Sequence, residues 1–255
     1  MVLNIHLWYM AALQPAIPIL FTIGRMNPVT PGHLRVVEQM LDEAKRRGVP
    51  MVYVILSNNM KDPNRNPLPC ALKAQLLGKM VRARFGQDAG MVSIRCVPDG
   101  IHFVYQPLET LVDEFPGGKF DFVMFAGEDR AEMADKIRGI KKLAPLMNAE
   151  AEMVPLRRTG HVAEYTPGKQ PTAQEMSGSF IRDVVLKTKG QPLPERLEVF
   201  CSLYEGYLAQ EDCAELFRVL DAALQPASET KKSKGKLHRK HTHKRTCKHC
   251  KNKHK

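Results

Sequence analysis

Two short segments combine turn-forming residues with side chains suited to binding phosphate. The first, residues 21–33 (FTIGRMNPVTPGH), holds a glycine, an arginine and a histidine. The second, residues 176–182 (MSGSFIR), holds two hydroxyl groups and a guanidinium. Glycine allows a backbone to approach a ligand closely, and the N–H groups at the start of a helix attract anions. The first segment therefore predicts a site for an anion, whereas the residue types of the second are also those of an ordinary helix start.

The first segment lies between a predicted strand and a predicted helix. Residues 17–23 form a short apolar run with β-branched members, which is typical of a buried strand. Gly24 permits close backbone approach, Asn27-Pro28 favours a turn, and a helix is expected to begin near His33. The two familiar phosphate loops, Gly-x-Gly-x-x-Gly and Gly-x4-Gly-Lys-Ser/Thr, do not occur in the chain. This loop is therefore of a different type.

The elements expected around these segments alternate between strands and helices. This order predicts an α/β fold with a Rossmann-like parallel sheet that carries helices on both faces. Ligands bind such sheets at the carboxyl ends of the strands, so the chemistry is expected there. Further strands are predicted at residues 51–56, 91–97, 120–126 and 151–155, and helices at residues 33–47, 71–85, 107–115, 130–137, 180–188, 195–207 and 212–224.

Residues 57–68 form a long polar loop after the second predicted strand. Lys61 and Arg65 lie in this loop, and Lys73 lies on the helix that follows it. The loop is either a solvated surface segment or, because of its place after a strand, part of a ligand site.

Residues 126–130 (AGEDR) follow the fourth predicted strand. Gly127 would let the backbone approach a ligand, and the carboxylate of Asp129 would take hydroxyl groups or a cation. The acids could equally cap the next helix. The same alternative applies to Ser177 and Ser179, either of which can cap the helix predicted at residues 180–188.

The motifs resemble those of one enzyme superfamily. Residues 24–33 resemble the Gly-x-Phe-x-Pro…(His/Thr)-x-Gly-His signature of nucleotidyltransferases related to cytidylyl-, nicotinamide-mononucleotide- and pantetheine-phosphate adenylyltransferases, with Met26 in place of Phe and Thr30 in place of the first His. Residues 176–182 are similar to the Ile-Ser-x-Thr-x-x-Arg motif that closes the active site, and residues 127–129 to a Gly-x-Asp element near the nucleotide. Class I aminoacyl-tRNA synthetases share the opening signature, but their Lys-Met-Ser-Lys-Ser-type loop is absent here.

The resemblance implies a nucleotidyltransferase that moves AMP, or less readily CMP, from ATP or CTP to a small phosphate-bearing acceptor and releases pyrophosphate. Mg2+ would be held largely by phosphates and water. The alternative is a catalytically degenerate nucleotide-binding domain in an RNA- or DNA-binding protein, against which the intact His33 and Arg182 argue. The implied residues are, for catalysis, His33, Thr30 and Arg182; for the nucleotide, Gly24, Arg25, Met26, Gly127, Asp129, Ser177 and Ser179; and for the acceptor, Lys61, Arg65 and Lys73.

Charge divides the chain into a neutral body and a basic tail. The net charge is +11, but residues 226–255 hold 12 of the 38 Lys and Arg residues and one of the 27 acids. A neutral body argues against a nucleic-acid groove across the fold. We expect a nucleotidyltransferase α/β domain over residues 1–190, helices packed on it over residues 191–225, and a disordered tail of Lys, Arg and His over residues 226–255.

The tail carries two possible binding functions. Cys247 and Cys250 have the Cys-x2-Cys spacing of a zinc site, with His254 as a third ligand, although one such pair is also compatible with no metal. The positive charge would attract nucleic acid without sequence preference, or serve as a localisation signal.

Two features of the whole chain bear on its location. Apolar runs of about 18 residues, as a membrane span needs, do not occur. The six cysteines show no dense disulfide spacing, which indicates a reducing compartment inside the cell, cytoplasmic or nuclear.

Overall fold

A computed structural model gives the fold of the chain, which divides into two units, Met1–Gln225 and Pro226–Lys255. The second unit, where the tail is predicted, lies outside the described residues. The structure describes residues 16–97, 106–116, 118–127, 135–137, 139–141, 143–148, 151–156, 162, 164–169, 171–172 and 175–224.

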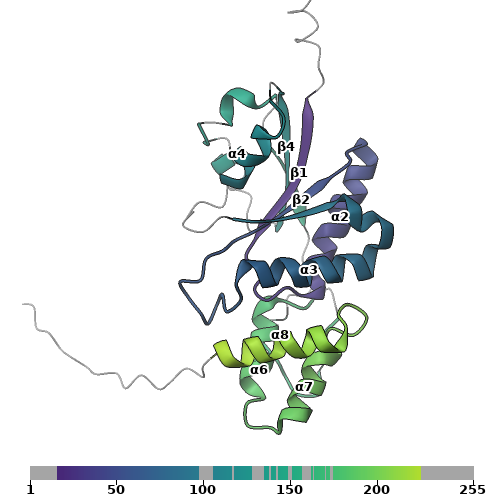
Figure 1. The fold of residues 1–255 in the computed structure, drawn as a ribbon, viewed down its shortest axis with the longest axis vertical. Coiled ribbons are helices and arrows are strands. Elements are labelled where there is room, and N and C mark those ends of the chain that lie inside the picture. Colours follow the sequence, from purple (N-terminus) through teal and green to yellow (C-terminus); the bar gives the residue numbers. More distant parts are fainter. Residues whose placement is uncertain are drawn as a thin grey trace, which may run out of the picture. The chain divides into compact units, whose positions relative to one another are not determined.

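The described part of the first unit contains a five-stranded parallel sheet with the order β3-β2-β1-β4-β5 (Figure 1). β2 and β3 lie in succession on one side of β1, whereas β4 pairs with the other side of β1. The carboxyl ends of β1 and β4 thus flank the point at which the strand order reverses, where such sheets bind ligands. The strands are β1 (Ile17–Gly24), β2 (Val52–Leu56), β3 (Val92–Cys96), β4 (Phe120–Gly127) and β5 (Glu152–Leu156).

Helices cover both faces of the sheet, because successive strand residues point to opposite sides. Leu20, Val54 and Phe125 face a core shared with α2 and α3, whereas Phe21 and Met124 face a second core shared with α4. The predicted α/β fold with helices on both faces is confirmed. The helices are α2 (Pro31–Arg47), α3 (Cys70–Phe85), α4 (Gln106–Asp113), α6 (Gly178–Lys187), α7 (Leu193–Ser202) and α8 (Gln210–Ala223), with short 3-10 helices at Gly86–Met91 and Ala144–Leu146.

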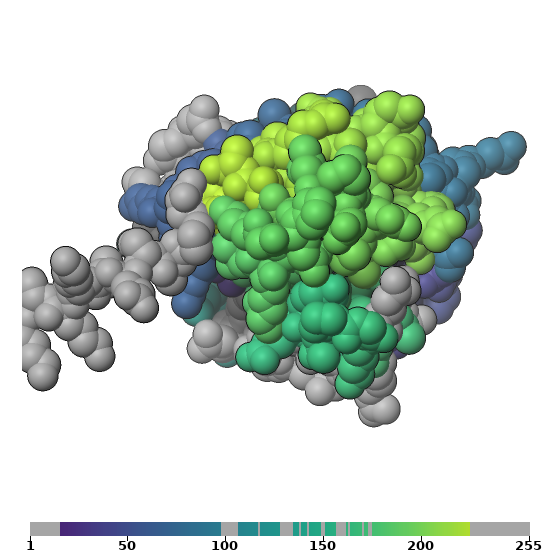
Figure 2. Space-filling view, turned by 90° about the horizontal axis from the view of Figure 1, so that it is seen from below, coloured from purple at the N-terminus to yellow at the C-terminus, as the bar shows by residue number. Residues whose placement is uncertain are grey.

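The three C-terminal helices join the core of the α2 and α3 layer. Phe200, Tyr204 and Phe217 are buried in the same cluster as Val29 of the β1–α2 loop. These helices, green to yellow in Figure 2, cover much of the face seen there. α7 ends at Ser202, earlier than the predicted 207, because the chain leaves it through turns with hydrogen bonds between residues three apart.

Among the described residues, the structure contains no helix with the length and apolar character needed to cross a membrane.

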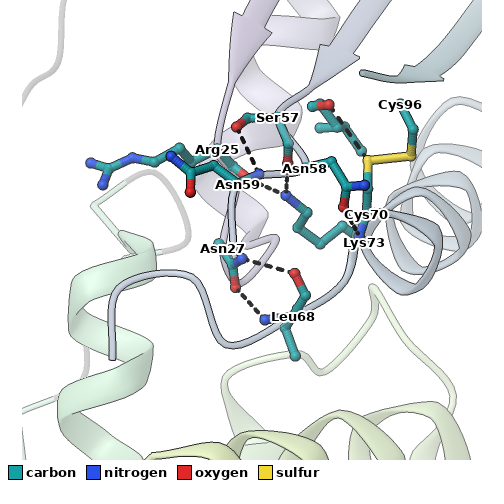
Figure 3. The surroundings of a disulfide bond; sticks show 10 residues. Arg25, Asn27, Ser57, Asn58, Asn59, Leu68, Cys70, Lys73 and Cys96 are labelled. Atoms are coloured by element: carbon teal, nitrogen blue, oxygen red, sulfur yellow. Dashed lines mark hydrogen bonds between the residues drawn. A yellow bond between two sulfur atoms is a disulfide. The ribbon is translucent and has the colours of Figure 1, made fainter. Parts of the chain in front are cut away.

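A disulfide joins Cys70, the first residue of α3, to Cys96, the last residue of β3 (Figure 3). The two cysteines are 26 residues apart, and the fold brings their Cα atoms to 5.9 Å. Their spacing along the sequence does not indicate the pair, because only the packing of α3 against the β3 edge creates it. The bond does not fit the reducing compartment that the cysteine spacing predicts. Cys201 and Cys213 are free and buried, and burial raises the pKa of both thiols.

Removing this disulfide should destabilise the first unit. A crosslink that closes a loop of this length typically contributes about 3 kcal/mol to the free energy of unfolding. We expect Cys70→Ser and Cys96→Ser to lower that free energy by similar amounts, with the double variant costing little more than either single variant. Denaturant titration with and without reductant measures this. Reductant should destabilise the wild type and leave the double variant unchanged; equal effects on both would contradict the assignment.

Candidate active site

A cleft of about 260 Å³ opens at the carboxyl ends of β1 and β4. Its walls come from the β1–α2 loop, the first turns of α2, the ends of β4 and β5, and the start of α6. The fold thus brings segments from both halves of the sheet to one place. Nine of the residues singled out in the sequence line the cleft: Gly24, Arg25, Met26, His33, Arg65, Gly127, Ser177, Ser179 and Arg182.

The β1–α2 loop has an unusual backbone. Met26 adopts a left-handed conformation with φ of 41°, and the Asn27-Pro28 peptide bond is cis. The Met26 side chain is buried in the core on the α2 side of the sheet. An apolar residue at this position therefore anchors the loop, as the sequence comparison of Met with Phe suggests.

His33 lies in the first turn of α2, where the helix dipole favours anions. The backbone N–H of Thr30 donates to His33 Nδ1 over 2.9 Å, which is half of a capping box with histidine in the place of the usual acid. Because Nδ1 accepts this hydrogen bond, the proton of a neutral ring resides on Nε2. The loop thus fixes both the orientation of the ring and its tautomer.

Thr30 does not line the cleft, although the sequence placed it among the catalytic residues. Its side chain is fully buried, and Oγ1 donates to the carbonyl oxygen of Met176 over 3.0 Å. This hydrogen bond joins the β1–α2 loop to the segment before α6, across 146 residues. The structure therefore places Thr30 behind His33, in a position to support it.

Arg182 connects the start of α6 to the β1–α2 loop. Its Nη1 donates to the carbonyl oxygen of Asn27, and its Nη2 donates to Ser179 Oγ over 3.1 Å. Burial lowers the pKa of Arg182, and the positive charges of Arg25 and Arg65 lower it further. The guanidinium of Arg182 is thus close enough to Arg25 and Arg65 to be repelled by their charges, and an anion bound among them would relieve that repulsion.

Ser177 is the N-cap of α6, one of the two alternatives that its sequence left open. Its Oγ accepts the backbone N–H of Phe180 over 3.1 Å and donates to the carbonyl oxygen of Val162 over 3.1 Å. Between the two serines, Gly178 lies directly against the β1–α2 loop. A Cβ atom there would stand 3.0 Å from the carbonyl oxygen of Asn27. The absence of a side chain therefore permits the close approach of the two segments.

The three predicted acceptor residues lie in different surroundings. Arg65 lines the cleft, and Lys61 is exposed on the same loop. Lys73 is only 2% exposed, and its ammonium donates to two backbone carbonyl oxygens, so it is not presented to an acceptor. Asp129 and the tail residues Cys247, Cys250 and His254 lie outside the described residues.

The cleft also has lining residues that the sequence did not single out as site residues. One of them is Arg35, which lines the cleft from α2. Asn27 also lines it and joins the two loops: Nδ2 donates to the carbonyl oxygen of Leu68, and Oδ1 accepts the Leu68 N–H, both over 3.0 Å. The sequence indicated Asn27 only as a turn residue, because its partner is 41 residues away.

Comparisons with known proteins address the same region. Residues 21–84 match the family model described as cytidylyltransferase-like, a span that contains the β1–α2 loop and His33. No sequence among curated proteins matches the chain. A solved structure, Plasmodium falciparum nicotinic acid mononucleotide adenylyltransferase complexed with NaAD, matches with 10% identity and a TM-score of 0.43 over 74% of this chain and 97% of that chain.

The family match and the motif resemblance coincide on one loop and one helix start. Residues 21–84 are therefore similar to the cytidylyltransferase-like family, in agreement with the motif resemblance to nucleotidyltransferases.

Proposed function

We propose that this protein transfers a nucleotidyl group, AMP or CMP, from a nucleoside triphosphate to a small phosphate-bearing acceptor and releases pyrophosphate. The observation that carries the proposal is the convergence of His33 with the guanidinium groups of Arg25, Arg65 and Arg182 on one cleft. The cleft lies where the strand order reverses, which is the usual ligand site of such a sheet.

The chemistry of the transfer suits these groups. Negative charge on the bridging oxygen grows as the bond to pyrophosphate breaks, so the protein chiefly has to supply fixed donors and positive charge. His33 offers such a donor through Nε2–H, because Thr30 holds Nδ1 as an acceptor. A donor that is already oriented needs no reorganisation during the reaction.

The arginines suit the phosphates that leave. Arg182 and Ser179 are hydrogen-bonded to each other at the start of α6, where the terminal phosphates would meet both a guanidinium and a helix N-terminus. On the other side, Gly127 ends β4 and would face the nucleoside, with Asp129 as its proposed partner for hydroxyl groups. Arg65 and the exposed Lys61 would then receive the phosphate of the acceptor.

Mg2+ would enter with the triphosphate. Within the described residues, no group of three or more His, Cys, Asp or Glu side chains could hold a metal ion. The oxygen ligands that Mg2+ requires would come mainly from phosphates and water. When bound, the ion would neutralise charge on the phosphates, while His33 and the arginines orient them.

Incubation of the full chain with ATP or CTP and a panel of phosphorylated acceptors, followed by pyrophosphate measurement, tests the proposed activity. Acceptor-dependent release of pyrophosphate is the expected result. Nucleotide binding without release, for every acceptor, would instead support the catalytically degenerate domain.

Replacing His33 should slow turnover without a comparable loss of affinity. Because the charge that His33 would stabilise develops only in the transition state, His33→Ala is expected to lower kcat by about 10²–10³-fold while the affinity for triphosphate changes little. Steady-state kinetics and calorimetric titration measure the two quantities. Gln39→Ala, on the same helix and the same cleft wall, is the matched control and should stay near wild type. A folded His33→Ala enzyme with near-normal kcat would refute the assignment.

Replacing Arg182 should weaken substrate binding as well as slow turnover, unlike the replacement of His33. A guanidinium on the terminal phosphates contacts the bound substrate as well as the transition state. Arg182→Ala is therefore expected to raise the KM for triphosphate as well as to lower kcat, by about tenfold or more in each, and Arg182→Lys should recover only part of the loss. An effect on kcat alone would mean that Arg182 does not hold the terminal phosphates.

Adding a methyl group at Gly178 should disturb the contact between the start of α6 and the backbone of the β1–α2 loop. A Cβ atom at 3.0 Å from the carbonyl oxygen of Asn27 would push the start of α6 away from the β1–α2 loop. We expect Gly178→Ala to lower kcat/KM by about tenfold. Gly190→Ala is the control, since its Cβ would meet nothing within 4 Å. Equal activity of the two variants would show that the close approach is not needed.

A further inference from the structure

Lys73 reaches from the first turn of α3 to the ends of two strands (Figure 3). Its Nζ donates to the carbonyl oxygen of Arg25 over 2.8 Å and to that of Ser57 over 2.5 Å. Arg25 directly follows β1, and Ser57 directly follows β2. One ammonium group therefore ties the β1–α2 loop to the loop between β2 and α3.

A second hydrogen bond joins the same two strand ends. The backbone N–H of Ser57 donates to the carbonyl oxygen of Gly24 over 3.0 Å. Arg25 is the residue after Gly24, so hydrogen bonds hold the backbone on both sides of it. Ser57 donates to the carbonyl oxygen of Gly24, and Lys73 donates to the carbonyl oxygen of Arg25 itself. The Arg25 side chain leaves this fixed point and lines the cleft.

The position of Lys73 carries an energetic cost. The side chain is 2% exposed, and burial lowers its pKa to about 8. Within the described part of the chain, no carboxylate forms an ion pair with it; the contacts that offset the burial are the two carbonyl oxygens. An apolar side chain would fill the same volume without this cost, but it would leave both carbonyl oxygens without these donors.

We propose that Lys73 is a positioning residue, which fixes the backbone of Arg25 against the β2–α3 loop and thereby sets the geometry of the anion-binding cleft. The inference rests on the proposed function for the identity of the anion, a triphosphate. It replaces the expectation from sequence that Lys73 contacts the acceptor.

The rest of the loop explains why one contact has this effect. Met26 lies between the carbonyl groups of Arg25 and Asn27, which accept hydrogen bonds from Lys73 and Arg182 respectively. Its left-handed backbone is a conformation that a non-glycine residue adopts only when its surroundings hold it there. Loss of the hydrogen bond from Lys73 would free the carbonyl group of Arg25, on the N-terminal side of Met26. Arg25 would then lose its fixed position toward the other two guanidinium groups.

The experiment compares three variants of the full chain. Lys73→Met keeps an unbranched apolar stem and removes the donor, whereas Lys73→Arg keeps N–H donors. Met80→Ala removes a fully buried side chain that lies about two turns further along the same helix, and it serves as the control for general destabilisation. Two measurements are made on each variant: local amide hydrogen exchange, and the affinity for inorganic tripolyphosphate by calorimetry.

In Lys73→Met, the amides of residues 24–27 and 57–59 should exchange about tenfold faster relative to those of α8, and tripolyphosphate should bind about tenfold more weakly. Lys73→Arg should recover part of both losses. Met80→Ala should leave the relative exchange of these loops, and the affinity, within about twofold of wild type. If Lys73→Met does not fold, Lys73→Gln, with one amide donor on a shorter stem, takes its place with the same expected direction.

Wild-type exchange and affinity in the folded Lys73 variant would overturn the proposal, as would losses that Met80→Ala reproduces. The two arms also separate this proposal from the proposed function. If the wild type itself does not bind tripolyphosphate, the triphosphate site is wrong, and the hydrogen-exchange arm still decides whether Lys73 holds the two loops.

Discussion

Three carbonyl oxygens of the β1–α2 loop accept hydrogen bonds from side chains that come from three different segments. Lys73 on α3 donates to Arg25, Arg182 on α6 donates to Asn27, and the hydroxyl group of Tyr204, beyond α7, donates to Val29 over 2.7 Å. Buried backbone groups must find partners, and a loop that leaves a strand cannot find them in the sheet. The conformation of this loop therefore depends on the packing of the helices around it.

Hydrogen bonds also hold the two ends of this loop. His33 Nδ1 accepts the backbone N–H of Thr30, and the carbonyl oxygen of Gly24, the residue before Arg25, accepts the backbone N–H of Ser57. Preorganised donors and charges lower a barrier because they need not move when charge develops. The segment between α7 and α8 contributes directly, since Tyr204 is fully buried and its hydroxyl group donates to Val29 of the loop. The C-terminal part of the first unit therefore helps to hold the β1–α2 loop in its conformation.

The same geometry gives Arg182 two roles. Its Nη1 closes the contact between α6 and the loop, and its Nη2 lies with Ser179 at the helix start. The guanidinium thus stays near Arg25 and Arg65 even though their charges repel it. A polyanion bound beside these groups would reduce that repulsion, which links the arrangement of the arginines to the proposed reaction.

The sequence by itself determined the alternation of strands and helices, and with it the parallel sheet, because apolar periodicity is a local property. It also located the loop of His33 and the start of α6, whose residue types and spacing are local too. Only the tertiary structure decided the burial of Lys73, the Cys70–Cys96 bond and the bond from Thr30 to Met176. These depend on contacts between residues 48, 26 and 146 positions apart, which no local pattern encodes.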